Sequence, residues 1–137
     1  MKKILFILIL ISTSFSFLHA QNKSKVSTKY AAVISFNSFG TGTPSDKPLR
    51  QYITKFKKSA AIGKICADKM GPFGREGEYK LGFVLKELNV SQKRRFLSGL
   101  AKVVDAMKDK GNAELLLSQT INLKEMNERA TTEIVKF

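Results

Sequence analysis

Histidine and cysteine are almost absent from this chain. The sequence has 1 histidine, His19, and 1 cysteine, Cys66, among 137 residues. His19 lies in the leader predicted below, so the chain after that leader has no histidine. This absence excludes Ser-His-Asp and Cys-His catalysis, histidine metal sites and histidine pH switches. A single cysteine excludes an internal disulfide, and we expect Cys66 to be a buried structural thiol. The sequence therefore predicts no metal site, no cofactor and no catalytic residue of these kinds.

Acidic residues are scarce as well. The chain has 24 lysine and arginine residues against 11 aspartate and glutamate residues, and its formal net charge is +13. A charge excess of this size favours an acidic polysaccharide, an anionic lipid or an acidic protein as partner. The alternative is a solvated basic surface that keeps the protein soluble. No aromatic-rich RNA-binding strand or zinc finger is present, which argues against nucleic acid.

The N-terminus has the layout of a secretory signal peptide. The basic segment Met1–Lys3 precedes the apolar run Ile4–Ile11, and Ala20 is a suitable cleavage position. The apolar run is shorter than the roughly 20 residues that a membrane-spanning helix needs, so an uncleaved anchor is the weaker alternative. We therefore expect a small exported bacterial protein, secreted or periplasmic, with no transmembrane span after cleavage. The expected organisation is a signal peptide over residues 1–20, a flexible lead-in over 21–28 and one domain over 29–137.

Apolar periodicity predicts alternating strands and helices. In the first predicted strand the alternation places Tyr30, Ala32, Ile34 and Phe36 on one face. Asn89 and Gln92 have the spacing of a capping box at the start of the second helix, and Gly111 is expected to end that helix. The predicted strands cover residues 30–39, 62–70 and 78–88, and the predicted helices cover 47–59 and 90–110.

Residues 112–137 fit either strand or helix. We expect a strand, a short helical piece around Asn122–Glu128 and a terminal strand. An antiparallel sheet with both long helices on one face accommodates the whole order. This is the α+β, ferredoxin-like split β-α-β sandwich, here with an extra C-terminal strand. The fold hosts enzymes, carriers and binding modules, so it does not determine the function.

The segment Met70–Phe83, MGPFGREGEYKLGF, is the most distinctive part of the chain. Its three glycines before Glu78 predict a long hairpin loop, in which Lys69 would lie opposite Glu78 as a charge pair. Three interpretations stay open for this loop. It is a structural turn, or a recognition loop in which Arg75 binds a carboxylate, sulfate or phosphate, or a catalytic site. The catalytic interpretation needs Glu76 and Glu78 on one strand face, about 7 Å apart.

A second glycine-rich segment, Phe39–Asp46, precedes the first helix. Such a segment can hold an anion at the helix N-terminus, but it lacks the spacing of a phosphate loop. A flexible connection in which Ser45 or Asp46 caps the helix is the favoured interpretation.

Together these observations predict an exported binding module that recognises an acidic envelope or extracellular partner. The alternatives are a small hydrolase that uses Glu76 and Glu78 with Arg75, and a subunit of a larger envelope assembly. The sequence favours binding over catalysis and leaves the oligomeric state open. The candidate binding residues are Arg75, Glu76 and Glu78 in the loop and Lys55, Lys57, Lys58, Arg94 and Arg95 on the helices.

Overall fold

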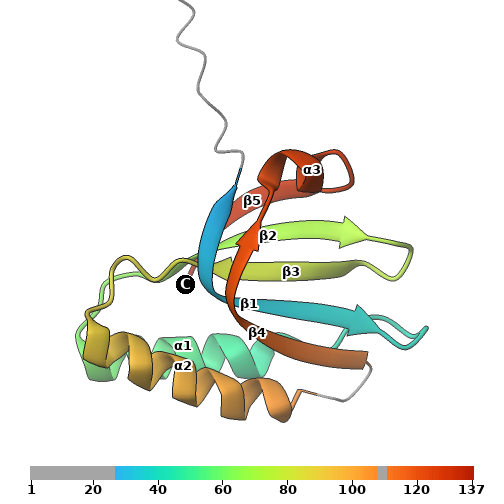
Figure 1. Ribbon diagram of the computed structural model, residues 1–137. Helices are drawn as coiled ribbons and strands as arrows, with labels where there is room; N and C mark the ends of the chain where they lie inside the picture. The colour runs from blue at the N-terminus through green and yellow to red at the C-terminus, as the bar shows by residue number, and fades with distance from the viewer. Residues whose placement is uncertain (1–26, 108–110) are drawn as a thin grey trace, which may run out of the picture.

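The structure is a computed structural model that describes residues 27–107 and 111–137. The predicted signal peptide and most of the predicted lead-in lie outside the described residues. The described chain has an α+β fold, with a five-stranded antiparallel sheet and three helices (Figure 1). Its elements are β1 (Thr28–Ser38), α1 (Lys47–Ala60), β2 (Cys66–Phe73), β3 (Glu78–Phe83), α2 (Val90–Asp105), β4 (Gly111–Ile121), α3 (Leu123–Asn127) and β5 (Thr131–Lys136).

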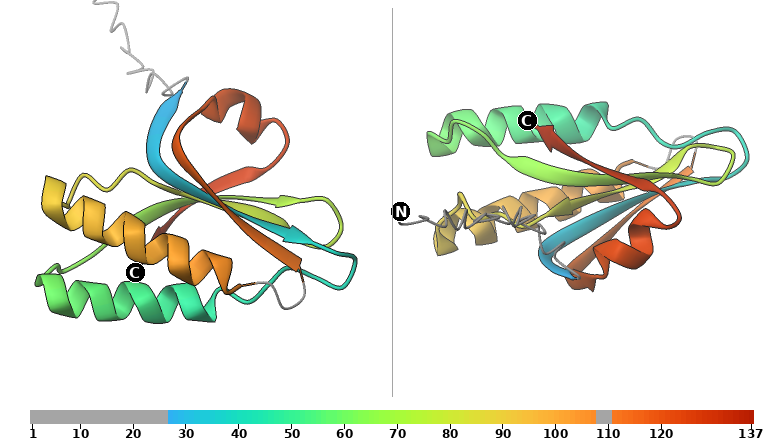
Figure 2. Two further views of the ribbon diagram at one scale, coloured as in Figure 1. Left: turned by 60° about the horizontal axis from the view of Figure 1, so that its bottom comes forward. Right: turned by 90° about the horizontal axis from the view of Figure 1, so that it is seen from above.

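The strands lie in the order β4-β1-β3-β2-β5. β1 pairs with β3 and β4, and β2 pairs with β3 and β5, so β4 and β5 form the two edges. Helices α1 and α2 lie side by side against one face of this sheet, whereas α3 lies on the other side (Figure 2). We call α1 and α2 the helix layer, and the opposite face of the sheet the open face.

The larger hydrophobic core lies between the helix layer and the sheet. The apolar stripes that the sequence predicts for both helices face inward, and alternate residues of β1 and β3 meet them. The ring of Phe96 is central to this core, with its centroid 5.1 Å from Phe56, 5.6 Å from Tyr52 and 5.9 Å from Phe83. The fully buried side chains here include Ile34, Phe36, Leu49, Ile53, Leu81, Phe83, Phe96 and Leu100.

A smaller cluster lies on the open face, and it corrects one prediction. Tyr30 does not share a face with Ala32, Ile34 and Phe36, but packs with Val33 and Met70 under α3. Tyr30 and Val33 lie on the same face although they are three residues apart, so the strand alternation is interrupted between them. Gly82 makes room for the ring, since a Cβ at that position would come within 2.6 Å of it. The glycine leaves the space that the ring occupies. The Tyr30 hydroxyl then donates a hydrogen bond to Asp68 Oδ2 at 2.7 Å.

The predicted bounds of the first strand and the first helix agree with the structure to within two residues, as do the starts of β3 and α2. The second strand, predicted over 62–70, spans Cys66–Phe73, and β3 ends at Phe83 and not at residue 88. The capping box is confirmed, because Asn89 Oδ1 accepts from the Gln92 N–H and Gln92 Oε1 accepts from the Asn89 N–H. Helix α2 ends at Asp105, not near residue 110, and Gly111 begins β4 instead of ending the helix. A Cβ at Gly111 would collide with the carbonyl oxygen of Asn37, so the close approach of β1 and β4 requires glycine there.

Three further details refine the ends of the elements. Strand β1 begins at Thr28, the last residue of the predicted lead-in. Cys66, expected to be buried, is half-buried at the start of β2. The segment that fitted either strand or helix forms β4, α3 and β5, as expected for its strand, helix and strand pieces.

Candidate functional site

The hairpin of β2 and β3 contains the distinctive loop. Strand β2 continues to Phe73, which pairs with Glu78, so the connection is the four-residue turn Gly74–Gly77 and not a long loop. Gly74 and Gly77 have φ angles of +67° and +75°, which favour glycine. A register shift lies between Met70 and Phe73. The glycine-rich turn predicted from the sequence is therefore present, but it is shorter than predicted and covers only residues 74–77.

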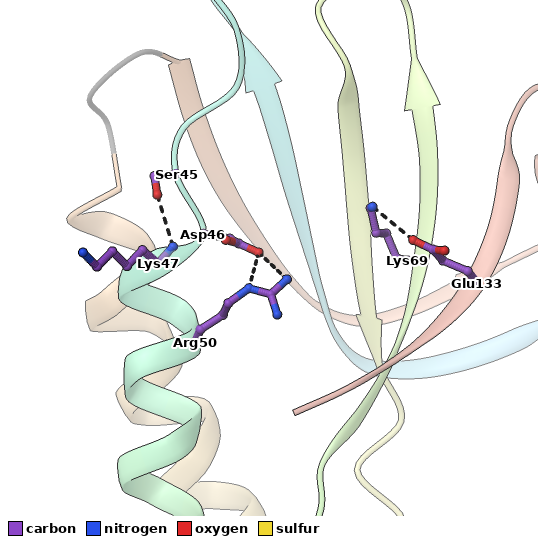
Figure 3. A network of polar contacts seen from close by, with 6 residues as sticks. All are labelled: Ser45, Asp46, Lys47, Arg50, Lys69 and Glu133. Carbon is purple, nitrogen blue, oxygen red and sulfur yellow. Dashed lines mark hydrogen bonds and ion pairs between the residues drawn. The ribbon is translucent and has the colours of Figure 1, made fainter.

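This register makes the predicted pair of Lys69 and Glu78 wrong. Lys69 lies opposite Leu81 in β3, and its Nζ is 3.0 Å from Oε1 of Glu133 in β5 (Figure 3). Two facts cause the difference. The register shift displaces Glu78 along the hairpin, and β5 lies on the other side of β2 and brings Glu133 beside Lys69.

The three loop candidates are in different environments. Arg75 and Glu76 are exposed in the turn, and neither makes an ion pair or side-chain hydrogen bond with another described residue. Glu78 is half-buried at the start of β3. Since Glu76 lies in a turn and not in a strand, it does not share a strand face with Glu78 as the paired-carboxylate interpretation assumed. The structure therefore does not place these residues as that interpretation requires.

The five helical candidates fall into two groups. Lys57 and Arg95 take part in packing, since Lys57 Nζ donates to the backbone oxygen of Phe137 at 2.6 Å. The Arg95 guanidinium lies 5.2 Å from the Phe56 ring centroid, a cation–π contact. By contrast, Lys55, Lys58 and Arg94 are exposed and make no ion pair with another described residue. Arg95 is exposed as well and makes no ion pair with a described residue, so of the five candidates only Lys57 is held by a hydrogen bond.

The helix layer has an extreme charge composition. Helices α1 and α2 together carry nine lysine and arginine residues and one acidic residue, Asp105, at the end of α2. The end of α1 and the start of α2 lie together at one end of the molecule, and the β2–β3 turn lies at the opposite end (Figure 1). The predicted loop contact and the predicted basic clusters therefore do not form one continuous surface.

A cavity of about 480 Å³ opens on the open face, between the sheet and α3. Glu78 and Lys80 of β3 line it, with apolar contributions from Phe73, Ile121 and Met126. The remaining lining residues are Asn37, Tyr79, Thr120, Asn122, Glu125 and Arg129. Sequence reasoning did not find this site. The only available signal was the alternation of β3, which sends Glu78 and Lys80 to the face opposite Leu81 and Phe83.

Glu78 has an unusual position in this cavity. Its Oε2 atom is buried and has no hydrogen-bond partner among the residues that the structure describes. The same atom lies 2.9 Å from the place that a Cβ of residue 74 would occupy, so Gly74 makes room for the carboxylate. Lys80, two residues along the same strand, also makes no ion pair with a described residue. In contrast, Glu125 and Arg129 on the α3 side of the cavity form an ion pair, with a guanidinium nitrogen of Arg129 3.9 Å from Oε1 of Glu125.

A second groove, of about 580 Å³, separates the start of α1 from β2 and β5. Each wall holds an ion pair, Asp46 with Arg50 at 2.8 Å and Lys69 with Glu133 (Figure 3). The half-buried Tyr79 also lines the groove, and desolvation by burial raises the pKa of its hydroxyl well above the ordinary value. Every charged side chain that lines this groove is already paired, so the groove presents no free charge to a ligand.

The glycine-rich connection before α1 is held by its own hydroxyl groups. Ser38 Oγ accepts hydrogen bonds from the N–H groups of Gly40 and Gly42, and Ser45 Oγ accepts from the N–H of Lys47. Asp46 occupies the N-cap position, but its carboxylate binds Arg50 and makes no capping bond. The segment is therefore a connection in which Ser45, the residue before the N-cap, accepts from the first helical N–H, whereas a capping bond from Asp46 is absent.

Comparison of this chain with family models, curated proteins and solved structures finds no match. Within residues 27–107 and 111–137, no three acidic, histidine or cysteine side chains come together in a way that could hold a metal ion. None of the helices in this part of the chain is both long enough and apolar enough to span a membrane.

Proposed function

We propose that this protein is an exported binding module that recognises an acidic polysaccharide through the outer surface of its helix layer. The observation that carries the proposal is the composition of that layer, nine basic residues against one acidic residue. Exposed cations attract a polyanion by releasing its counterions, and they need no deep pocket for this. Lys55, Lys58 and Arg94 supply unpaired charge, whereas Lys57 joins α1 to the C-terminal residue Phe137 and Arg95 packs on the Phe56 ring of α1.

A linear polysaccharide fits this surface better than a lipid bilayer does. Binding in the plane of a membrane needs an apolar face that enters the lipid. The apolar stripes of α1 and α2 are buried against the sheet, and Val90 is the one large apolar side chain of the helix layer among the exposed ones. Among the described residues, the other exposed large apolar side chains are Phe39 in the connection after β1, Leu117 on β4 and Ile134 on β5. Their separation also gives little support to an obligate subunit of an envelope assembly.

We also propose the finer features of fold and location. The order of elements and the strand order β4-β1-β3-β2 support a ferredoxin-like sandwich, to which β5 adds an edge strand. The basic start and the apolar run of residues 1–20 support export and cleavage after Ala20, which would place the domain in the periplasm or outside the cell. An acidic polysaccharide of the envelope or the surroundings would be accessible in either place.

The test is binding of the purified protein to alginate across a series of salt concentrations, with anionic vesicles as a second probe. We expect alginate affinity to fall steeply with salt. The double variant Lys55→Glu/Lys58→Glu should weaken binding at least about tenfold, because each reversal replaces attraction with repulsion. The matched control is Arg75→Glu/Lys124→Glu, which changes the net charge equally at exposed positions outside the helix layer.

Each outcome has a distinct meaning. Equal losses in both double variants would show that net charge alone acts, and they would contradict a site on the helix layer. A loss confined to the variant with Arg75→Glu would move recognition to the hairpin turn. Preference for vesicles over alginate would replace the polysaccharide by a lipid surface.

A further inference from the structure

We propose that the cavity on the open face binds a small zwitterion with an apolar body, such as an apolar α-amino acid, between Glu78 and Lys80. This inference does not depend on the proposed function. The cavity is lined in part by α3, and α3 and the helix layer lie on opposite sides of the sheet (Figure 2).

The size and shape of the cavity suit a small ligand. Its volume of about 480 Å³ is within the range of small-molecule sites, roughly 300–1,000 Å³. The floor is the rigid sheet and the wall is the end of β4 with α3, so the site is formed by elements that are distant in the sequence. Phe73, Ile121 and Met126 provide apolar surface for the body of a ligand.

The unpaired charges determine the chemical class of that ligand. Glu78 has no donor for its carboxylate, and Lys80 has no acceptor for its ammonium group, among the described residues. The buried Oε2 atom of Glu78 is costly without a partner, because water reaches this oxygen poorly. A ligand that carries both an ammonium and a carboxylate group satisfies both side chains, whereas an anion alone or a cation alone satisfies only one.

The spacing of the two side chains agrees with this assignment. Residues two apart in a strand are about 7 Å apart and point to the same side. The ammonium and carboxylate groups of an α-amino acid are separated by two covalent bonds, about 3 Å in all. Two charge-assisted hydrogen bonds therefore fit between Glu78 and Lys80, with the amino-acid side chain directed toward Met126.

Methionine methyl NMR gives a direct test. The protein is labelled with methyl-¹³C methionine and titrated with L-phenylalanine and L-leucine. Met126 lines the cavity, and the buried Met107 lies in the core beneath the helix layer, so Met107 serves as the internal control for an intact fold. We expect saturable shifts of the Met126 signal and none of the Met107 signal.

Charge variants and ligand analogues test the two polar contacts. Glu78→Gln and Lys80→Gln should each raise the Kd at least about tenfold, the loss expected for one charge-assisted hydrogen bond. The control Glu76→Gln, in the exposed turn two residues away, should change the Kd less than about twofold. N-acetyl-L-phenylalanine lacks the ammonium group and should bind weakly to the wild type, and Glu78→Gln should no longer distinguish it from L-phenylalanine.

Two results would overturn the proposal. The first is the absence of any saturable Met126 shift with either amino acid at millimolar concentration. The second is an equal effect of Glu78→Gln and Glu76→Gln on binding. Neither result bears on alginate binding by the helix layer, so the two proposals fail separately.

Discussion

The two faces of the sheet are built from the same strands, but only one of them is fully covered by apolar packing. The face under the helix layer is closed by two long apolar stripes and by interlocking aromatic rings. The open face has a small cluster under the five-residue helix α3 and retains a cavity with an unpaired carboxylate. The closed face therefore holds most of the buried apolar packing, whereas the open face keeps the cavity. Substitutions on the two faces should therefore have unequal effects on folding.

The largest expected effect is on the closed face. Phe96→Ala removes a fully buried ring that contacts three other aromatic rings, and it should lower the free energy of unfolding by about 3–5 kcal/mol. The matched variant on the open face is Phe73→Ala, whose half-buried ring borders the cavity, and it should cost less than about 2 kcal/mol. Urea unfolding of both variants measures the difference. Equal costs would contradict the division between the faces.

Adding a methyl group on the open face tests how tightly its small apolar cluster is packed. Gly82→Ala places a Cβ within 2.6 Å of the buried Tyr30 ring and should cost about 1–3 kcal/mol, because the ring has little room to move. Gly63→Ala is the control, since nothing lies within 4 Å of its Cβ, and it should stay within about 0.5 kcal/mol of the wild type. If Gly82→Ala were neutral in the same urea experiment, the packing of Tyr30 on β3 would be looser than described.

The smallest expected effect is the dependence of stability on alkaline pH. Burial raises the pKa of Tyr52 to about 12, and burial together with the Asp68 carboxylate raises the pKa of Tyr30 further. Because these values exceed the value of about 10 for an unfolded chain, the contribution to stability is complete below pH 10 and is lost as the pH rises through the folded pKa. Stability should therefore decline above pH 10.

The same experiment compares the two faces. Tyr52 belongs to the closed face and Tyr30 to the open face. Tyr52→Phe and Tyr30→Phe should each reduce the slope of the unfolding free energy against pH above 10, and the slope, unlike the absolute value, is insensitive to the lost hydrogen bonds. A slope unchanged in both variants would mean that lysine deprotonation, and not tyrosine, controls the alkaline limit.

Local patterns in the sequence predicted the elements that depend on neighbours a few residues away. The alternation of β3, the capping box at Asn89 and the stripe of α2 are such patterns, and the structure has all three. Each is determined by the period of a strand or a helix, so the residues around it contain the necessary information.

The features that the sequence did not predict depend on contacts between distant segments. Lys69 pairs with Glu133 because β5 returns beside β2, and no local pattern identifies that neighbour. Tyr30 lies on the open face, where Gly82 in another strand leaves space for its ring. The cavity has the same origin, since its floor belongs to β3 and its wall to α3.

The position of β1 has a consequence for the way the chain is made. β1 is the first strand of the described chain to leave the ribosome, yet its two partners in the sheet, β3 and β4, are synthesised later, and β4 comes after both long helices. Until β4 emerges, the apolar segment of β1 has an unpaired edge. Such non-local pairing slows folding and prolongs the exposure of an aggregation-prone strand. We therefore expect the nascent chain to depend on chaperones more strongly than other domains of this size do.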